Sequence, residues 1–294
     1  MTKRFLLRLG LAVVLGCVVS AAGAREQPVP VAASIVPVAT FVERVGGERV
    51  DVTVMVGPEA NPATYEPTPR QMAAIGRSRA FFRVGVPFEQ AWMGRIEANN
   101  PGIEVVDLRE RLTLRSMGSG DHAHGHADGD RGQPDPHVWT DPRNVIAMAA
   151  QIRERLTELD PDGEAAYRAN FRDFRAELRS LHAELTALFE DVEQGRFLVY
   201  HPAWGYFADA YGLEQIAVEI EGKRPSARSL SRVIERAREA RVNAVFVQDQ
   251  FARRSAERVA QAIDARVTTM DPLAADYVAN MRRVGREFAE AVKP

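Results

Sequence analysis

Four of the six histidines of this 294-residue chain lie within residues 121–142, DHAHGHADGDRGQPDPHVWTDP. His122, His124 and His126 alternate with other residues in a Gly- and Asp-rich run, whereas His137 lies between two Asp-Pro steps beside a Trp. Imidazole is the commonest metal-binding side chain. The two settings predict two roles: metal capture by the alternating histidines and, at His137, either a metal ligand or a structural histidine held by Asp135 or Asp141. The alternative for the first three is a disordered linker, because Gly, Asp and His cannot build a core.

Two further polar residues directly follow apolar, strand-like runs. His201 follows FLVY and Asp271 follows VTTM, while His137 lies in the loop that enters a pair of helices. In α/β proteins the crevice outside the carboxyl ends of the strands is the usual ligand site. Two imidazoles and one carboxylate make a divalent-metal set whose donor types suit Zn²⁺. No HExxH spacing is present.

The elements that must position these residues form two blocks in which strand-like runs alternate with helical patterns. The first block comprises VPVAASIVP, VATFVERVGG, VDVTVMVG, RAFFRVGVP, FEQAWMGRIEANN and GIEVVDL, and the second comprises RFLVYHPAWGYFADAYG, EQIAVEI, SLSRVIERAREARVNAVFVQDQ and ARVTTMDPLAADYVANMRRVGREFAEAV. This alternation predicts an α/β fold with parallel sheets covered on both faces. We expect an N-terminal lobe over residues 25–143, with a His-rich loop at 119–132, and a C-terminal lobe over 195–294.

A helix pair over residues 144–194 separates the two blocks. A shorter helix is expected from Asn144 to Leu159, and a longer one from Glu164 to about Val192, roughly 43 Å long. The longer helix carries one apolar stripe, formed by Tyr167, Phe171, Phe174, Leu178, Leu181, Leu185, Leu188 and Val192. The stripe favours packing against both lobes of a monomer over a coiled-coil dimer. His182 falls off the stripe, so we expect it to be solvated.

The first 24 residues have the organisation of a secretory signal peptide. Three basic residues precede an apolar run that ends in the small residues AGA at Ala24. The alternative is a lipoprotein acylated at Cys17, within VLGC. Cys17 is the only cysteine, so a mature chain starting after Ala24 has neither disulfides nor thiolate ligands. Removal of the three basic residues lowers the formal net charge from −2 to −5. A negative net charge gives no reason to expect nucleic-acid binding.

The chain resembles the periplasmic zinc- and manganese-binding proteins of ABC importers, the cluster 9 (cluster A-I) solute-binding family. The resemblance rests, in order along the chain, on GPEANPATYEPTP, PDPHVWTDP, YHPAWGYFADAYGL, EGKRPSAR and TMDPLAADYVANMR. It implies two α/β lobes joined by a rigid helix, with the metal site between the lobes and little hinge opening. The ligand positions of the family fall here on His137, His201 and Asp271. A His at 201 and a His- and Asp-rich loop are both typical of zinc-binding members.

One departure concerns the first ligand of the family. Its usual motif, Gly-x-Asp-Pro-His-x-Tyr-Glu-Pro, appears here with Ala63 in place of the His. Three alternatives remain open: a water completes the site, one of the loop histidines replaces the missing ligand, or zinc binding has been lost on a retained scaffold. Asn61 offers an amide oxygen nearby, but amides are poor zinc ligands.

The leading hypothesis is a periplasmic protein that captures Zn(II) and delivers it to an ABC importer permease, with a metallochaperone as a candidate partner. It is expected not to be an enzyme. The alternatives are an adhesin or signalling module with altered or lost metal binding, and a zinc hydrolase, for which Glu66 is the only candidate base.

Several residues also have a purely structural interpretation. Asp271 could cap a helix that starts at Pro272, and Tyr65 and Glu66 could shape the rim of the site. An exposed loop is expected for the charged residues Glu219, Glu221, Lys223 and Arg224.

Overall fold

The computed structural model describes residues 27–117, 133–193, 195–219, 226–251 and 253–292. The predicted signal peptide, the three loop histidines, and Glu221, Lys223 and Arg224 lie outside these ranges. In the part of the chain that is described, no helix is long and apolar enough to cross a membrane.

The N-terminal lobe is built on a four-stranded parallel sheet with the order β2-β1-β3-β4. Its strands are β1 (Val29–Ile35), β2 (Val50–Val56), β3 (Ala80–Arg83) and β4 (Glu104–Asp107), connected by α1 (Val36–Gly46), α2 (Pro69–Ile75) and α3 (Pro87–Asn99). Six of the seven residues of β1 are buried, as a strand covered on both faces requires.

The C-terminal lobe repeats this arrangement with the strand order β6-β5-β7-β8. Its strands are β5 (Arg196–Val199), β6 (Glu214–Ala217), β7 (Ala244–Val247) and β8 (Arg266–Thr269). Its helices are α6 (Gly205–Ala210), α7 (Ala227–Glu239), α8 (Arg253–Ile263) and α9 (Tyr277–Val292). The predicted fold of two α/β lobes with parallel sheets is confirmed.

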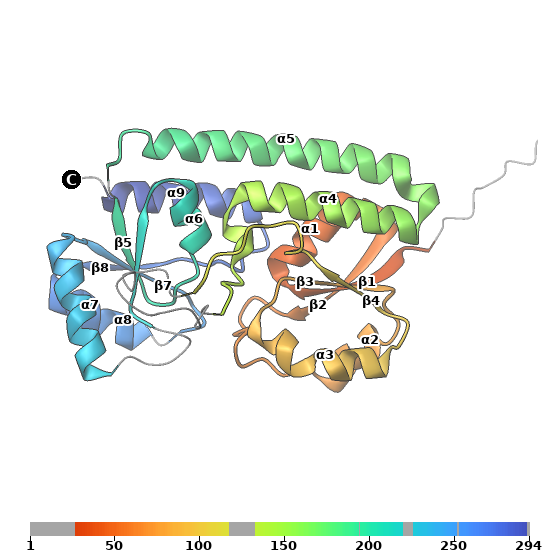
Figure 1. Ribbon diagram of the computed structural model, residues 1–294, viewed down its shortest axis with the longest axis horizontal. Helices are drawn as coiled ribbons and strands as arrows, with labels where there is room; N and C mark the ends of the chain where they lie inside the picture. The colour runs from red at the N-terminus through yellow and green to blue at the C-terminus, as the bar shows by residue number, and fades with distance from the viewer. Residues whose placement is uncertain (1–26, 118–132, 194, 220–225, 252, 293–294) are drawn as a thin grey trace, which may run out of the picture.

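Helices α4 (Pro142–Leu159) and α5 (Glu164–Phe189) form the predicted pair, and α5 runs across the top of both lobes (Figure 1). The apolar stripe of α5 packs on α1, α4 and α9, so this face is used within the chain. The helix ends at Phe189, three residues earlier than Val192, and Phe189 is buried in the last turn. The start of α4 follows its capping: Asp141 accepts a hydrogen bond from the backbone N–H of Arg143, and Pro142 is the first helical residue.

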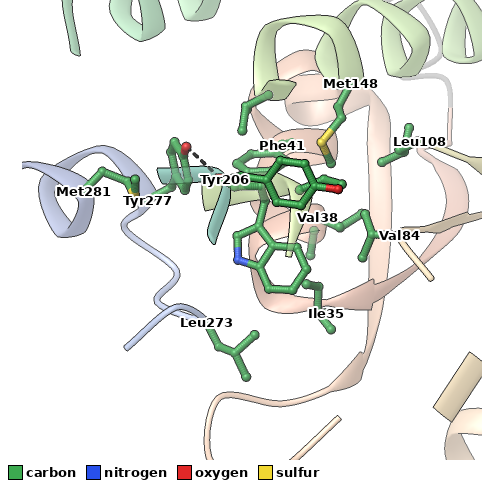
Figure 2. Close-up of a cluster of buried hydrophobic side chains, with 14 of the residues drawn as sticks. Ile35, Val38, Phe41, Val84, Leu108, Met148, Tyr206, Leu273, Tyr277 and Met281 are labelled. Atoms are coloured by element: carbon green, nitrogen blue, oxygen red, sulfur yellow. Dashed lines mark hydrogen bonds between the residues drawn. The ribbon is translucent and has the colours of Figure 1, made fainter. Parts of the chain in front are cut away.

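One hydrophobic core runs through the junction of the two lobes. Phe41 of α1 contacts Tyr277 of α9 edge to face, with ring centroids 5.0 Å apart, and Met148, Tyr206 and Met281 belong to the same cluster (Figure 2). The indole N–H of Trp139 donates to the carbonyl of Pro272 (2.8 Å), and the Tyr277 hydroxyl donates to the carbonyl of Trp139 (2.9 Å). The lobes are therefore joined by shared core packing as well as by α5.

Candidate metal centre

His137 lies just before a short 3-10 helix (Val138–Thr140) that leads into α4. It is 8% exposed. Asp135 makes two contacts with His137 through Oδ1. This oxygen lies 2.7 Å from the ring Nδ1 and accepts a hydrogen bond from the His137 backbone N–H at 3.0 Å. Since an ionised carboxylate can only accept, Nδ1 carries a proton, and in the neutral imidazole Nε2 then keeps its lone pair. Burial raises the pKa of Asp135, but the His137 imidazole and the Arg115 guanidinium outweigh that effect, so the pKa is lowered.

His201 lies two residues after β5, and its ring is fixed in the same way. Its Nδ1 lies 2.9 Å from Oε2 of Glu219, a buried residue two positions after β6. The ring of Phe251 stacks on the imidazole at 4.7 Å and 18°. Burial lowers the pKa of His201, which favours the neutral imidazole that binds metals.

The two imidazoles meet through their free nitrogens. Nε2 of His137 lies 3.3 Å from Nε2 of His201, with the rings nearly perpendicular. Two nitrogens bound to one tetrahedral zinc ion at about 2.0–2.1 Å lie about 3.3–3.4 Å apart. With both Nδ1–H groups directed at carboxylates, two neutral rings turn the lone pairs of their Nε2 atoms towards each other, and a cation between them satisfies both. The pair can thus supply two corners of a tetrahedral site.

Asp271 lies after β8, on the same side of the C-terminal sheet, but is engaged elsewhere. Its Oδ1 accepts from the backbone N–H of Leu273 (2.8 Å), and its carboxylate is hydrogen-bonded by Gln250, whose Nε2 also donates to the carbonyl of Pro58 (2.7 Å). Burial raises the pKa of Asp271. Within the described ranges, no group of three or more His, Cys, Asp or Glu side chains is placed to hold a metal ion, so Asp271 is not gathered with the two imidazoles.

The interpretation of Asp271 as a helix cap is wrong. Helix α9 begins at Tyr277 rather than at Pro272, and Asp271 closes only the turn formed by Pro272 and Leu273.

The position of the missing family ligand lies on the loop after β2. Ala63 is exposed, and its backbone N–H donates to Oδ1 of Asn61 at 2.8 Å. The Asn61 amide oxygen is therefore engaged in its own turn. Tyr65 donates its hydroxyl to Oε1 of Gln71 (2.6 Å) and packs on Phe88, while Glu66 is exposed.

Two expectations about single residues are wrong. Glu219 is 6% exposed and holds His201, rather than lying in an exposed loop. His182 is half-buried against Tyr211, with Nδ1 3.2 Å from the phenol oxygen, rather than solvated, and burial lowers its pKa. Glu219 could have been found from strand register, because Val199 pairs with Ala217, and both His201 and Glu219 lie two residues beyond this pair.

Known proteins share this architecture. The family model described as zinc-uptake complex component A, periplasmic (ZnuA), matches residues 31–291. A crystal structure of ZnuA superimposes with a TM-score of 0.83 at 36% identity, over 90% of this chain and 100% of that one.

Curated relatives agree with the structural match. The manganese-binding lipoprotein MntA of Halalkalibacterium halodurans is 29% identical over 212 residues, which cover 70% of this chain and 66% of that protein. The high-affinity zinc uptake system protein ZnuA of Bacillus subtilis is 25% identical over 258 residues, which cover 86% and 81%.

The chain is shorter than some of these relatives. It spans 48% of the zinc-binding lipoprotein AdcA of Streptococcus pneumoniae and 51% of AdcA of Streptococcus pyogenes. The family match, which covers most of the chain, confirms the resemblance drawn from the sequence motifs. The chain belongs to the family of periplasmic zinc-uptake complex components, which are solute-binding proteins and not enzymes.

Proposed function

We propose that this protein captures Zn(II) in the periplasm and delivers it to the permease of an ABC importer. The distance of 3.3 Å between Nε2 of His137 and Nε2 of His201 carries the proposal, because it matches the nitrogen–nitrogen edge of a tetrahedral zinc site. One relative is named for high-affinity zinc uptake and another for manganese binding, which supports a divalent metal as the cargo.

Zinc is favoured over manganese by the donor atoms. Two imidazole nitrogens dominate the set, and the affinity of nitrogen donors for divalent metals rises from manganese towards copper and zinc. Both imidazoles are oriented by carboxylates, an arrangement that commonly contributes 10–100-fold to metal affinity.

Asp271 is the proposed third ligand. It follows β8 at the carboxyl edge of the sheet that also carries His201, and its carboxylate is hydrogen-bonded by the side chain of Gln250. Exchange of the Gln250 hydrogen bond for a bond to zinc would bring an anionic oxygen to the two nitrogens. The fourth position, which Ala63 leaves without a side-chain ligand, is proposed for a water or a loop histidine.

The proposal is tested by equilibrium dialysis and thermal unfolding of the mature chain with Zn²⁺ and Mn²⁺. Zinc is expected to bind and raise the melting temperature, because a ligand at a thousandfold excess over Kd stabilises the native state by about 4 kcal/mol relative to the unfolded state. His201→Ala should lose this shift and His182→Ala, the matched control, should keep it. An unchanged shift in His201→Ala, or displacement of zinc by equimolar manganese, would contradict the proposal.

A further inference from the structure

We propose that Arg115 is a positioning residue for metal capture: its guanidinium holds the carboxylate of Asp135 against His137 and thereby selects the ring nitrogen that faces the metal. The effect of Arg115 on zinc affinity rests on the proposed function, whereas its effect on the tautomer of His137 does not.

The Asp135 carboxylate is held from two sides. Nη1 of Arg115 lies 3.1 Å from Oδ2, while Oδ1 contacts the backbone N–H and the ring Nδ1 of His137. Asp135 is 1% exposed, so in the folded chain its charge is stabilised by protein partners rather than by bulk water. Loss of the guanidinium removes the charged partner of Oδ2 from a buried carboxylate, a change that favours rotation or rearrangement of the group.

The backbone fixes the two partners relative to each other. The carbonyl of Arg115 accepts from the N–H of Asp135 at 2.8 Å, and an antiparallel bridge joins Ser116 to Pro134. The Tyr206 hydroxyl accepts from the N–H of Arg115 (3.1 Å) and donates to the carbonyl of Asp135 (3.1 Å). Residues 115–117 and 133–135 are thus paired with each other, which gives the Arg115 side chain a fixed backbone anchor.

The C-terminal lobe contributes the other side of the guanidinium site. Nε of Arg115 lies 2.9 Å from Oδ2 of Asp209 in α6. A Cβ atom at Gly205, the first residue of α6, would lie 1.3 Å from Nη1 of Arg115. The φ angle of Gly205 is not positive, so the need for glycine here is one of space. Gly205 therefore leaves the room in which Arg115 reaches Asp135.

The functional effect follows from the imidazole tautomer. With Asp135 in place, Nδ1 keeps the proton and Nε2 is free for a metal. A displaced carboxylate allows the tautomer with the proton on Nε2, in which Nε2 has no lone pair to offer a metal. Loss of an orienting partner of this kind commonly weakens metal binding 10–100-fold.

The experiment measures zinc affinity by chelator competition and the tautomer of His137 by ¹⁵N NMR of the metal-free, full mature chain. The variants are Arg115→Gln, Arg115→Lys and Gly205→Ala, and the His137 signal is assigned by its loss in His137→Ala. The matched control is Arg109→Gln: Arg109 is 18% exposed against 19% for Arg115, and it pairs with Asp107, which contacts no histidine among the described contacts.

Arg115→Gln and Gly205→Ala are each expected to weaken zinc binding about 10- to 100-fold and to populate the Nε2–H tautomer. Arg115→Lys should keep more of the zinc affinity and more of the Nδ1–H tautomer than Arg115→Gln does, and Arg109→Gln should match the wild type in both measurements. A pure Nδ1–H tautomer in Arg115→Gln, or a loss equally large in Arg109→Gln, would overturn the proposal. A wild-type chain that binds no zinc would instead refute the proposed function and leave the tautomer result to decide the role of Arg115.

Discussion

At the scale of single residues, the two histidines and their supporting groups differ in how far the sequence predicts them. His137 and His201 are recognisable because each stands in a motif with Pro and Trp nearby, PDPHVW and YHPAW. Glu219 has no such context, and its role depends on strand register: β5 pairs with β6 so that His201 and Glu219 emerge side by side. Gln250, which ties Asp271 to Pro58, depends on contacts between lobes that periodicity does not encode.

The gap at Ala63 gives a residue-scale prediction that separates water from a loop histidine. If the loop supplies the fourth ligand, replacing His122, His124 and His126 together should weaken zinc binding by more than the 10–100-fold of an orienting group. Ala63→His should then restore affinity in that background. If water fills the position, the loop replacement should leave affinity nearly unchanged, and Ala63→His should tighten binding with the loop histidines present.

Zinc titration of the wild type, the triple loop variant, Ala63→His and their combination forms a double-mutant cycle. Strong coupling between the triple loop replacement and Ala63→His supports a loop histidine as the fourth ligand, whereas additive effects on zinc affinity contradict it.

At the scale of elements, apolar periodicity located the strands and helices well, and it failed mainly at ends, where capping decides. Helix α5 stops at Phe189 although the stripe continues to Val192, because the chain turns there towards β5. The start of α9 also differs from the expectation: Asp271 and Pro272 form a turn rather than the cap and first residue of a helix, and α9 begins at Tyr277.

The junction of α4 and α5 gives an element-scale prediction about pH. Arg49 forms two hydrogen bonds with the Asp160 carboxylate (2.7 and 2.8 Å), and the Tyr167 hydroxyl adds a third (2.5 Å). The Arg49 contact is the main cause that lowers the pKa of Asp160 below its usual value of 3.8. Because the folded-state pKa is lowered, the stabilisation is present above about pH 4 and is lost as the pH falls through the folded-state value.

Asp160→Asn should therefore lower the free energy of unfolding of the metal-free protein by about 1–2 kcal/mol at pH 7, and the difference from wild type should narrow below about pH 4. Urea unfolding at a series of pH values measures this. Asp162→Asn, in the same turn but exposed, is the control and should have little effect. A difference that stays constant down to pH 3 would contradict the role assigned to the ionised carboxylate.

At the scale of the whole molecule, the continuous core across the lobe junction implies that the lobes unfold together. Phe41 lies between Phe174 of α5 and Tyr277 of α9, so core side chains of the N-terminal lobe, the long helix and the C-terminal lobe are in direct contact. A shared core is less compatible with wide hinge opening than a flexible linker, and it would keep the nitrogens of His137 and His201 close before metal arrives.

This cooperativity is testable with one core truncation in each lobe. Phe88 packs on Tyr65 within the N-terminal lobe, and Phe288 packs on Phe197 within the C-terminal lobe; both are almost fully buried. Phe88→Ala and Phe288→Ala should each lower the free energy of unfolding by about 3–5 kcal/mol. If the lobes form one cooperative unit, each variant should speed amide hydrogen exchange equally in β1 and β5. Faster exchange confined to the mutated lobe would show that the lobes open separately, and the metal site between them would then have to be assembled by lobe closure.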